Sequence, residues 1–425
     1  MNQEFSFMHE KIKDKPFYKK KWVRLLAMTI FLAIVFGLIA SAVFIKVTDW
    51  QEQKREQEAI TEIEIPKDAP EDMETSETPV VPETTPSQNQ DTTPETIVVD
   101  PQITKEDYMV LYANFRGLAK EAQKSLVTVT AVNHDVDWFN EEYQNRGQCS
   151  GLIIGDNGVE LLVLTKYQMI ESCDGINVTF VDETSSMAAL KKYDVVTNLA
   201  VISINLSDIS ESTREKIQNA ALGSSIRLEA GSPVLAIGRA DGSEGSMKVG
   251  MLTSARNKQS VIDAEYTILV TDMLKNAGAD GILINLNGEV VGIMQEQHSA
   301  SNMQNVLTAY GVSDIKGLLE HLSNNQDIVY LGIKGTTVTK DALDAGVPEG
   351  VYITEVEMNS PAMKAGIQKG DVIQAVNGQK ITTMPEYSDV LSRLSNRQNI
   401  TLEGRRLTKD GYKKVNYQAS LSVLE

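Results

Sequence analysis

Few side chains in this chain of 425 residues are grouped for nucleophilic or metal chemistry. Ser313 and Lys316 have the S-x-x-K spacing of a serine that a lysine activates. Because an amphipathic apolar run follows Ser313, we expect this residue to cap the N-terminus of a helix instead. The histidines beyond residue 100 show no ligand spacing, so we expect neither a metal nor another cofactor. They are His134, His298 and His321.

Three segments have the order and spacing of a serine protease site but lack its residues. Residues 164–170 hold Gln168, residues 197–202 hold Asn198, and residues 278–281 hold Ala279 and Asp280. These segments resemble the His, Asp and Ser segments of HtrA/Deg-type trypsin-like serine proteases. Counting from the neighbouring segments on either side places the nucleophile at Asp280 or at Ala279, and both registers stay open.

The resemblance implies a catalytically inactive member of that family. A serine triad needs a hydroxyl nucleophile, an imidazole base and a carboxylate that stabilises the imidazolium. The amide of Gln168 neither accepts a proton near pH 7 nor carries the resulting charge. Asn198 brings no negative charge, and that change alone costs about 10⁴-fold in turnover where the base remains. Neither Ala279 nor Asp280 has a hydroxyl or a thiol. We therefore expect no catalytic residue.

The apolar patterns beyond residue 105 predict the elements that must position these segments. Residues 107–124 have helical spacing, and short runs bounded by Gly, Asn and Asp follow. The runs predict strands at residues 126–132, 149–154, 160–165, 176–181, 199–204, 233–238, 268–271 and 290–294. Such a pattern favours an all-β barrel or sandwich pair. The resemblance implies a mainly β fold, with a trypsin-like double β-barrel over residues 104–325.

Two loops depart from the family's pattern. Arg239 and Ala240 stand where the family has Asn-Pro, after a segment at 231–238 that is otherwise similar. Ala277 and Ile282 interrupt the loop that supplies the backbone N–H groups of the family's oxyanion hole. The resemblance therefore implies the barrel fold more strongly than it implies an oxyanion hole.

The last hundred residues resemble the PDZ domains of HtrA-type proteins. The matching segments are residues 350–356, 360–362, 365–367, 370–373 and 376–378. Tyr330, Leu331, Gly332 and Ile333 are similar to the loop whose backbone N–H groups cradle a terminal carboxylate, beside a strand edge that pairs with the peptide. Thr383 predicts the start of a helix that reaches about residue 394. We expect an α+β PDZ domain over 326–425 that binds C-terminal or unfolded peptides of extracytoplasmic proteins. A groove blocked by the chain itself remains the alternative.

The first hundred residues predict a membrane anchor and a tether. Residues 25–45 hold no charge and are long enough to cross a bilayer, so we expect a transmembrane helix over 25–46. The basic tail at 1–24 and the acids that follow the span place the N-terminus in the cytoplasm and the later domains outside it. A cleaved signal peptide is the alternative, because residues 40–42 are small. Residues 47–103, rich in Pro, Thr and acids, predict a disordered linker.

Two cysteines lie in the predicted barrel domain. Outside the cytoplasm, Cys149 and Cys173 would be free to oxidise to a disulfide that staples the edge of the former site. The alternative is a pair of packed thiols. No histidine is placed to activate Cys149 as a replacement nucleophile.

Two function classes remain. The first is a single-pass cell-membrane protein of the bacterial envelope with a degenerate triad, which acts as a peptide-binding or protein-binding scaffold or regulator in envelope protein quality control. The second is an active HtrA-type serine endopeptidase. The formal net charge of −18 opposes binding to nucleic acid. Family analogy alone suggests a homotrimer.

Overall fold

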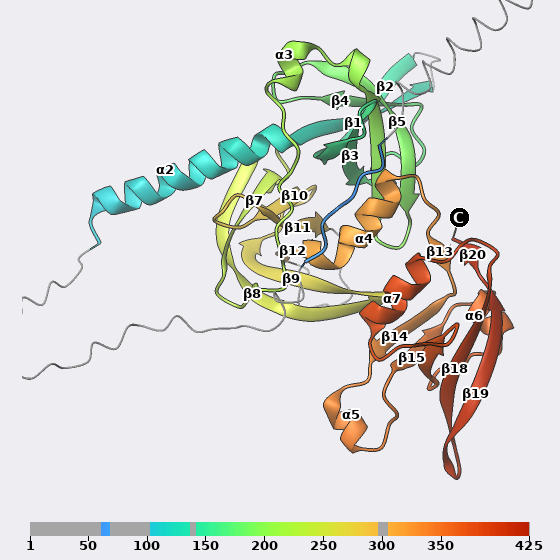
Figure 1. Ribbon diagram of the computed structural model, residues 1–425. Helices are drawn as coiled ribbons and strands as arrows, with labels where there is room; N and C mark the ends of the chain where they lie inside the picture. The colour runs from blue at the N-terminus through green and yellow to red at the C-terminus, as the bar shows by residue number, and fades with distance from the viewer. Residues whose placement is uncertain (1–60, 69–102, 137–141, 296–304, 425) are drawn as a thin grey trace, which may run out of the picture. The chain divides into compact units, whose positions relative to one another are not determined.

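The computed structural model describes residues 61–68, 103–136, 142–295 and 305–424. Short antiparallel strands close into two six-stranded barrels, in the orders β1-β2-β3-β6-β5-β4 and β10-β11-β12-β9-β8-β7 (Figure 1). This confirms the predicted double barrel. The strands of the first barrel are β1 (Leu126–Val136), β2 (Glu142–Asp156), β3 (Glu160–Lys166), β4 (Gly175–Thr179), β5 (Ser185–Asp194) and β6 (Leu199–Asn205). Those of the second are β7 (Pro233–Arg239), β8 (Ser246–Val261), β9 (Ala264–Leu274), β10 (Asp280–Ile284), β11 (Val290–Gln295) and β12 (Val306–Gly311).

Strand β6 shows why the apolar runs are nearly continuous. Successive side chains of a strand point to opposite faces. Ala200 and Ile202 pack in the core of the first barrel, whereas Leu199 and Val201 pack in a second cluster that holds residues of both barrels. Both faces of β6 are therefore buried, and the seam between the barrels is apolar.

Two longer helices flank the barrels. Helix α2 (Lys105–Ala122) begins at the N-cap Thr104, whose side chain exchanges hydrogen bonds with Asp107, as a capping box does. This confirms the helix predicted at residues 107–124. The predicted N-cap at Ser313 is wrong. Helix α4 (Val312–Ser323) has Gly311 as its N-cap, because β12 runs directly into the helix and buries Val312.

The α+β unit that follows has an open sheet. Strands β14-β15-β16-β18-β19 form the sheet in that order, so β14 lies at its edge. Thr383 caps α7 as predicted and accepts a hydrogen bond from the Glu386 N–H over 3.3 Å. The strands are β13 (Val329–Tyr330), β14 (Ile333–Thr337), β15 (Val351–Val356), β16 (Val372–Val376), β17 (Gln379–Lys380), β18 (Asn399–Thr408), β19 (Gly411–Ser420) and β20 (Ser422–Val423). The helices are α5 (Lys340–Asp344), α6 (Pro361–Lys364) and α7 (Met384–Ser392).

Part of the predicted linker packs on the barrels. Ile65 is buried in the cluster that lies between the barrels, and the Ile63 N–H and carbonyl both bond to the side chain of Asn324. Asp68 pairs with the buried Lys316 over 2.6 Å. Residues 61–68 therefore do not form the free tether that composition predicted.

The predicted membrane span at residues 25–45 lies outside the described residues. Within the ranges given above, no helix is long and apolar enough to cross a membrane.

Candidate functional site: the seam between the barrels and the carboxylate loop

The structure brings Gln168 and Asn198 together at the paired ends of two strands. Lys166 at the end of β3 pairs with Leu199 at the start of β6, so the residues just outside this pair meet. Oδ1 of Asn198 accepts a hydrogen bond from the backbone N–H of Gln168 over 2.7 Å. The carbonyl of Asn198 accepts one from Tyr167 over 3.0 Å. The side chain and the carbonyl of Asn198 therefore each accept a hydrogen bond from a backbone N–H of the turn η4 (Tyr167–Met169).

The sequence analysis did not identify Asp194, which stabilises the turn that leads into Asn198. The buried carboxylate of Asp194 accepts hydrogen bonds from the Thr197 hydroxyl over 2.6 Å and from its N–H over 3.0 Å. Asn198 follows with a φ of 59°, a left-handed conformation that Asn adopts more readily than most residues. Burial raises the pKa of Asp194, although the bonds from Thr197 and Val196 oppose the rise. Asp194 thus shapes the turn and does not reach Gln168 through any of these bonds.

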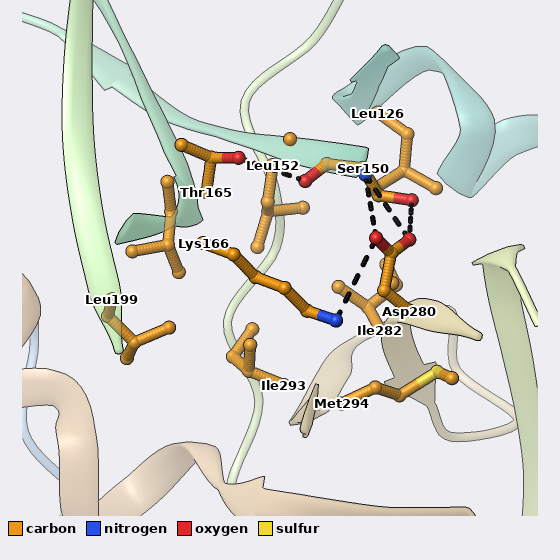
Figure 2. A pocket seen from close by; sticks show the side chains of 13 residues that line it. Leu126, Ser150, Leu152, Thr165, Lys166, Leu199, Asp280, Ile282, Ile293 and Met294 are labelled. Carbon is orange, nitrogen blue, oxygen red and sulfur yellow. Dashed lines mark hydrogen bonds and ion pairs between the residues drawn. The ribbon is translucent and has the colours of Figure 1, made fainter. Parts of the chain in front are cut away.

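The two candidates for the nucleophile position have different surroundings. Ala279 is buried in the core of the second barrel, and its N–H donates to the Asn276 carbonyl over 3.2 Å. Asp280 begins β10 and points toward the first barrel. Its Oδ1 accepts a 2.6 Å hydrogen bond from the Ser150 hydroxyl, and its Oδ2 lies 3.9 Å from the Lys166 ammonium (Figure 2).

Asp280 and its partners line a small cavity at the seam between the barrels. Its volume is about 30 Å³, which is room for one or two water molecules. Thr165 adds a further polar group, and the rest of the wall is mainly apolar and includes Leu152, Leu199 and Met294 (Figure 2). Burial raises the pKa of Asp280, and Lys166 and the bonds from Ser150 oppose that rise. Ser150 and Lys166 were not predicted to belong to the site, because they come from strands that only the closed barrel brings to Asp280.

A second hollow lies beside the first. It is lined by Lys166, Gln168, Asn198 and Tyr310, among others. No histidine lines either hollow among the residues that the structure describes. His298 falls in the undescribed segment 296–304. His321 lies on α4.

Both cysteines are free thiols, so the predicted disulfide is not formed. The Cys149 sulfur lies 3.2 Å from the Thr165 hydroxyl, and the Cys173 thiol donates to the Ile170 carbonyl over 3.3 Å. Burial raises the pKa of Cys149 to about 11. A thiol that is protonated at neutral pH is a poor nucleophile.

The loop predicted to bind a carboxylate holds one from within the chain. The N–H groups of Leu331 and Gly332 donate to Oδ2 of Asp263 over 2.8 and 2.7 Å, and the Ile333 N–H donates to Oδ1 over 3.2 Å. Gly332 has a φ of 94°, and a Cβ there would lie 2.3 Å from that of Ser360. The loop therefore requires glycine at this position. Sequence reasoning did not identify Asp263, which lies 68 residues before Leu331.

No group of three or more His, Cys, Asp or Glu side chains that could hold a metal occurs in the described part of the chain. The polar groups brought together around Gln168, Asn198 and Asp280 are two amides, a carboxylate, the Lys166 ammonium and the Ser150 hydroxyl. These groups can bind one another and water, and among the described residues that line the two hollows no imidazole accompanies the hydroxyl.

Two protein families match this chain. The trypsin-like peptidase domain family matches residues 149–293, and the PDZ domain family matches residues 352–406. The first covers strands of both barrels, and the second runs from β15 into β18 of the open sheet.

Curated relatives are HtrA-type proteases. The serine protease Do-like HtrB of Bacillus subtilis (strain 168) is 28% identical over 262 residues, which are 57% of this chain and 56% of that protein. A probable periplasmic serine endoprotease DegP-like of Hahella chejuensis is 29% identical over 279 residues, 63% of this chain and 57% of that protein. The chain thus spans a little over half the length of these relatives.

Solved structures share the fold. The HtrA-type protease AlgW with tripeptide matches with a TM-score of 0.53 and 22% identity, over 74% of this chain and 97% of that one. At this identity the likeness concerns the fold alone. The family matches and the curated relatives identify this chain as a homologue of the HtrA-type serine proteases, with a trypsin-like peptidase domain followed by a PDZ domain.

Proposed function

We propose that this HtrA homologue binds peptides without cutting them and acts as a membrane-anchored scaffold or regulator in envelope protein quality control. The observation that carries the proposal is the hydrogen bond from the Gln168 N–H to Oδ1 of Asn198. In a serine triad, the side chains at these two positions are an imidazole, which takes the proton of the nucleophile, and a carboxylate, which orients the imidazole and stabilises the imidazolium. Here an amide oxygen meets a backbone amide, and neither group titrates near neutral pH.

The nucleophile segment supports the same proposal. A methyl group at Ala279 and a carboxylate at Asp280 provide no hydroxyl for attack on a carbonyl carbon. The Ala279 N–H is already bonded to Asn276, whereas an oxyanion hole needs such a donor to face the reacting carbonyl.

Peptide binding is supported by the PDZ domain. Its family match and the three N–H groups that converge on one carboxylate fit recognition of a terminal carboxylate. Solved HtrA-type AlgW structures contain a tripeptide or a decapeptide. By analogy, we assign C-terminal or unfolded segments of extracytoplasmic proteins as the ligands.

The location outside the cytoplasm rests on the sequence. Seven Lys or Arg side chains precede the apolar residues 25–45, and acids dominate after them, which favours a cytoplasmic N-terminus and external domains. Names of curated relatives include the word periplasmic, which agrees with that assignment.

Activity assays on the full chain test the proposal. We expect no turnover of fluorescently labelled unfolded casein and no covalent labelling by a serine-directed phosphonate. Matched variants restore Gln168→His, Asn198→Asp and Ala279→Ser singly and together. If the unaltered chain is labelled at one serine and cleaves casein, the alternative of an active serine endopeptidase replaces this proposal.

A further inference from the structure

The loop between β8 and β9 projects a carboxylate from the second barrel. Val261, the last residue of β8, pairs with Ala264, the first residue of β9, so Ile262 and Asp263 form the two-residue turn. Asp263 has a φ of 56°. Turns of this kind favour Gly or Asn at a position with positive φ, and Asp is the acidic residue that tolerates it best. The turn thus carries a charge where an uncharged residue would suit the backbone equally well.

The PDZ domain supplies four hydrogen bonds to this carboxylate. Burial raises the pKa of Asp263, and these bonds oppose the rise. Besides the three loop N–H groups, the Tyr387 hydroxyl of α7 donates to Oδ1 of Asp263 over 2.8 Å. Four donors converge on a buried carboxylate, which offsets the large cost of removing a charge from water. Consecutive backbone donors on both oxygens of one carboxylate are the arrangement with which such a loop receives a peptide C-terminus.

The hairpin also donates hydrogen bonds to the edge strand that a bound peptide would use. The N–H of Asp263 donates to the Ile333 carbonyl over 2.7 Å, and the Ser260 hydroxyl donates to the Gly335 carbonyl over 2.7 Å. Ile333 and Gly335 are alternate residues of the edge strand β14, so their carbonyls face the same side. A peptide that extends the sheet would pair with this edge. The hairpin therefore takes both the carboxylate site and the first pairing positions.

We propose that Asp263 is an internal ligand of the PDZ carboxylate loop and that a peptide C-terminus binds only by displacing the β8–β9 hairpin. This inference rests on the proposed peptide-binding function and names its regulation. The carboxylate of Asp263 and the carboxylate of a peptide C-terminus cannot occupy the loop together. They would compete for the same four donors, and their like charges would repel. The apparent affinity for an external peptide is then the intrinsic affinity multiplied by the fraction of molecules in which the loop is open.

Displacement would also reach the degenerate site. Strand β9 runs from the turn at Asp263 to Leu274, and Ala279 and Asp280 follow after a short loop. A peptide that moves the turn thus acts on the strand that leads into the former nucleophile segment. This gives the two domains a direct mechanical connection through one hairpin.

The test uses two substitutions at the turn and one control. Asp263→Asn removes the charge, and Asp263→Gly removes the side chain. Asn and Gly both accept the positive φ of this position. Glu265→Gln is the control, because it changes charge equally, lies in the same hairpin and can still accept the hydrogen bond of the Thr336 hydroxyl.

Two readouts are applied to the full chain. Hydrogen–deuterium exchange followed by mass spectrometry reports the protection of residues 329–337. Fluorescence anisotropy reports the binding of labelled decapeptides that end in a free Val, Leu or Phe, together with their C-terminal amides. We expect both Asp263 variants to lose protection in the loop and to bind a free-carboxylate peptide about tenfold or more tightly than the unaltered chain. We expect Glu265→Gln to match the unaltered chain in both readouts.

The two readouts separate this inference from peptide binding itself. Unchanged protection in both Asp263 variants, or an equal gain in Glu265→Gln, overturns the internal ligand. Equal peptide affinity in the variants and the unaltered chain also overturns it. If no chain binds any peptide, the proposed peptide binding fails, and loss of protection in the Asp263 variants alone still supports occupancy of the loop by Asp263.

Discussion

The Tyr387 hydroxyl lies 2.8 Å from Oδ1 of Asp263, so a PDZ helix donates a hydrogen bond to the turn of a barrel hairpin. Both residues are buried. The pair ties α7 to the β8–β9 turn and completes the set of donors around the carboxylate. Through this contact the PDZ domain donates a hydrogen bond to a carboxylate of the second barrel that is buried from water.

Tyr387→Phe should therefore destabilise the chain without changing its shape. The variant keeps the buried ring and removes one donor to a carboxylate, a loss of about 1.5–3 kcal/mol in the free energy of unfolding. Chemical denaturation of both proteins measures the difference. Tyr112→Phe on the exposed face of α2 is the control and should show no change. Equal stability of Tyr387→Phe and the unaltered chain would contradict the prediction.

The Asn198 side chain should contribute to stability through the turn that it caps. Asn198→Ala removes the bond to the Gln168 N–H and places Ala at a positive φ, which together should cost about 2–3 kcal/mol. Asn198→Gly loses the bond but accepts the φ, so it should lie between Ala and the unaltered chain. Thermal and chemical unfolding measure both. An Ala variant as stable as the Gly variant would show that the conformation of residue 198 is unimportant.

Residues 61–68 should form a stable part of the fold. Asp68→Asn would leave the ammonium of Lys316 buried without its counter-charge and should cost about 3 kcal/mol. Lys67→Ala is the matched control, because its ion pair with Asp389 is solvent-exposed and should contribute less than about 1 kcal/mol. Protection of residues 61–68 from hydrogen exchange should fall in the first variant and persist in the second. Complete exchange of residues 61–68 in the unaltered chain would place the segment free in solution, and equal protection in both variants would show that the Asp68 ion pair does not hold it.

Local patterns were sufficient to predict much of this architecture. Short apolar runs bounded by Gly, Asn and Asp predicted eight of the twelve barrel strands, and Thr383 predicted the start of α7. Averaged composition failed at residues 61–68, where Ile63 and Ile65 alternate with acids as in a half-buried strand. Ser313 failed as a cap because helix α4 continues directly from a strand, and its hydroxyl instead accepts a bond from the Ser225 N–H over 2.8 Å.

The interdomain contact could not be predicted in this way. Asp263 and the loop at 330–333 are distant in sequence. Asp263 reads locally as part of an ordinary hairpin turn, and residues 330–333 read as a loop for a peptide carboxylate, so neither pattern indicates the other segment as its partner. Only closure of the second barrel and packing of the PDZ domain bring the charge to its donors. The same holds for Asp280, whose partners Ser150 and Lys166 come from two strands of the other barrel.

The membrane topology remains a prediction from charge and hydropathy. A phosphatase that is active only outside the cytoplasm, fused after the last residue, should be active, and a cytoplasmic reporter at the same position should be silent. Replacing the seven Lys and Arg residues of the N-terminal tail with Gln should weaken this bias. Full activity of the cytoplasmic reporter in the unaltered fusion would reverse the assigned orientation.

The pH dependence of stability should reveal a buried ion pair in the PDZ domain. The fully buried carboxylate of Asp371 accepts two hydrogen bonds from Arg406, over 2.7 and 2.8 Å, and one from the Tyr417 hydroxyl over 2.7 Å. Burial alone would raise the pKa of Asp371, but the bonds from Arg406, from the Gln368 N–H and from Tyr417 outweigh it and hold the pKa below its usual value.

Because the folded-state pKa of Asp371 is the lower one, the folded chain binds fewer protons at this group than the unfolded chain. Its contribution is therefore complete above the unfolded pKa and is lost as the pH falls through the folded pKa. Asp371→Asn should be less stable by about 2–3 kcal/mol at pH 7, a value below that of a fully buried pair because Arg406 is partly exposed. The difference between the two proteins should hold down to about pH 5 and shrink below about pH 4. Urea denaturation across pH 3–7 measures it, and a difference that stays constant over that whole range would show that Asp371 is not charged in the folded chain.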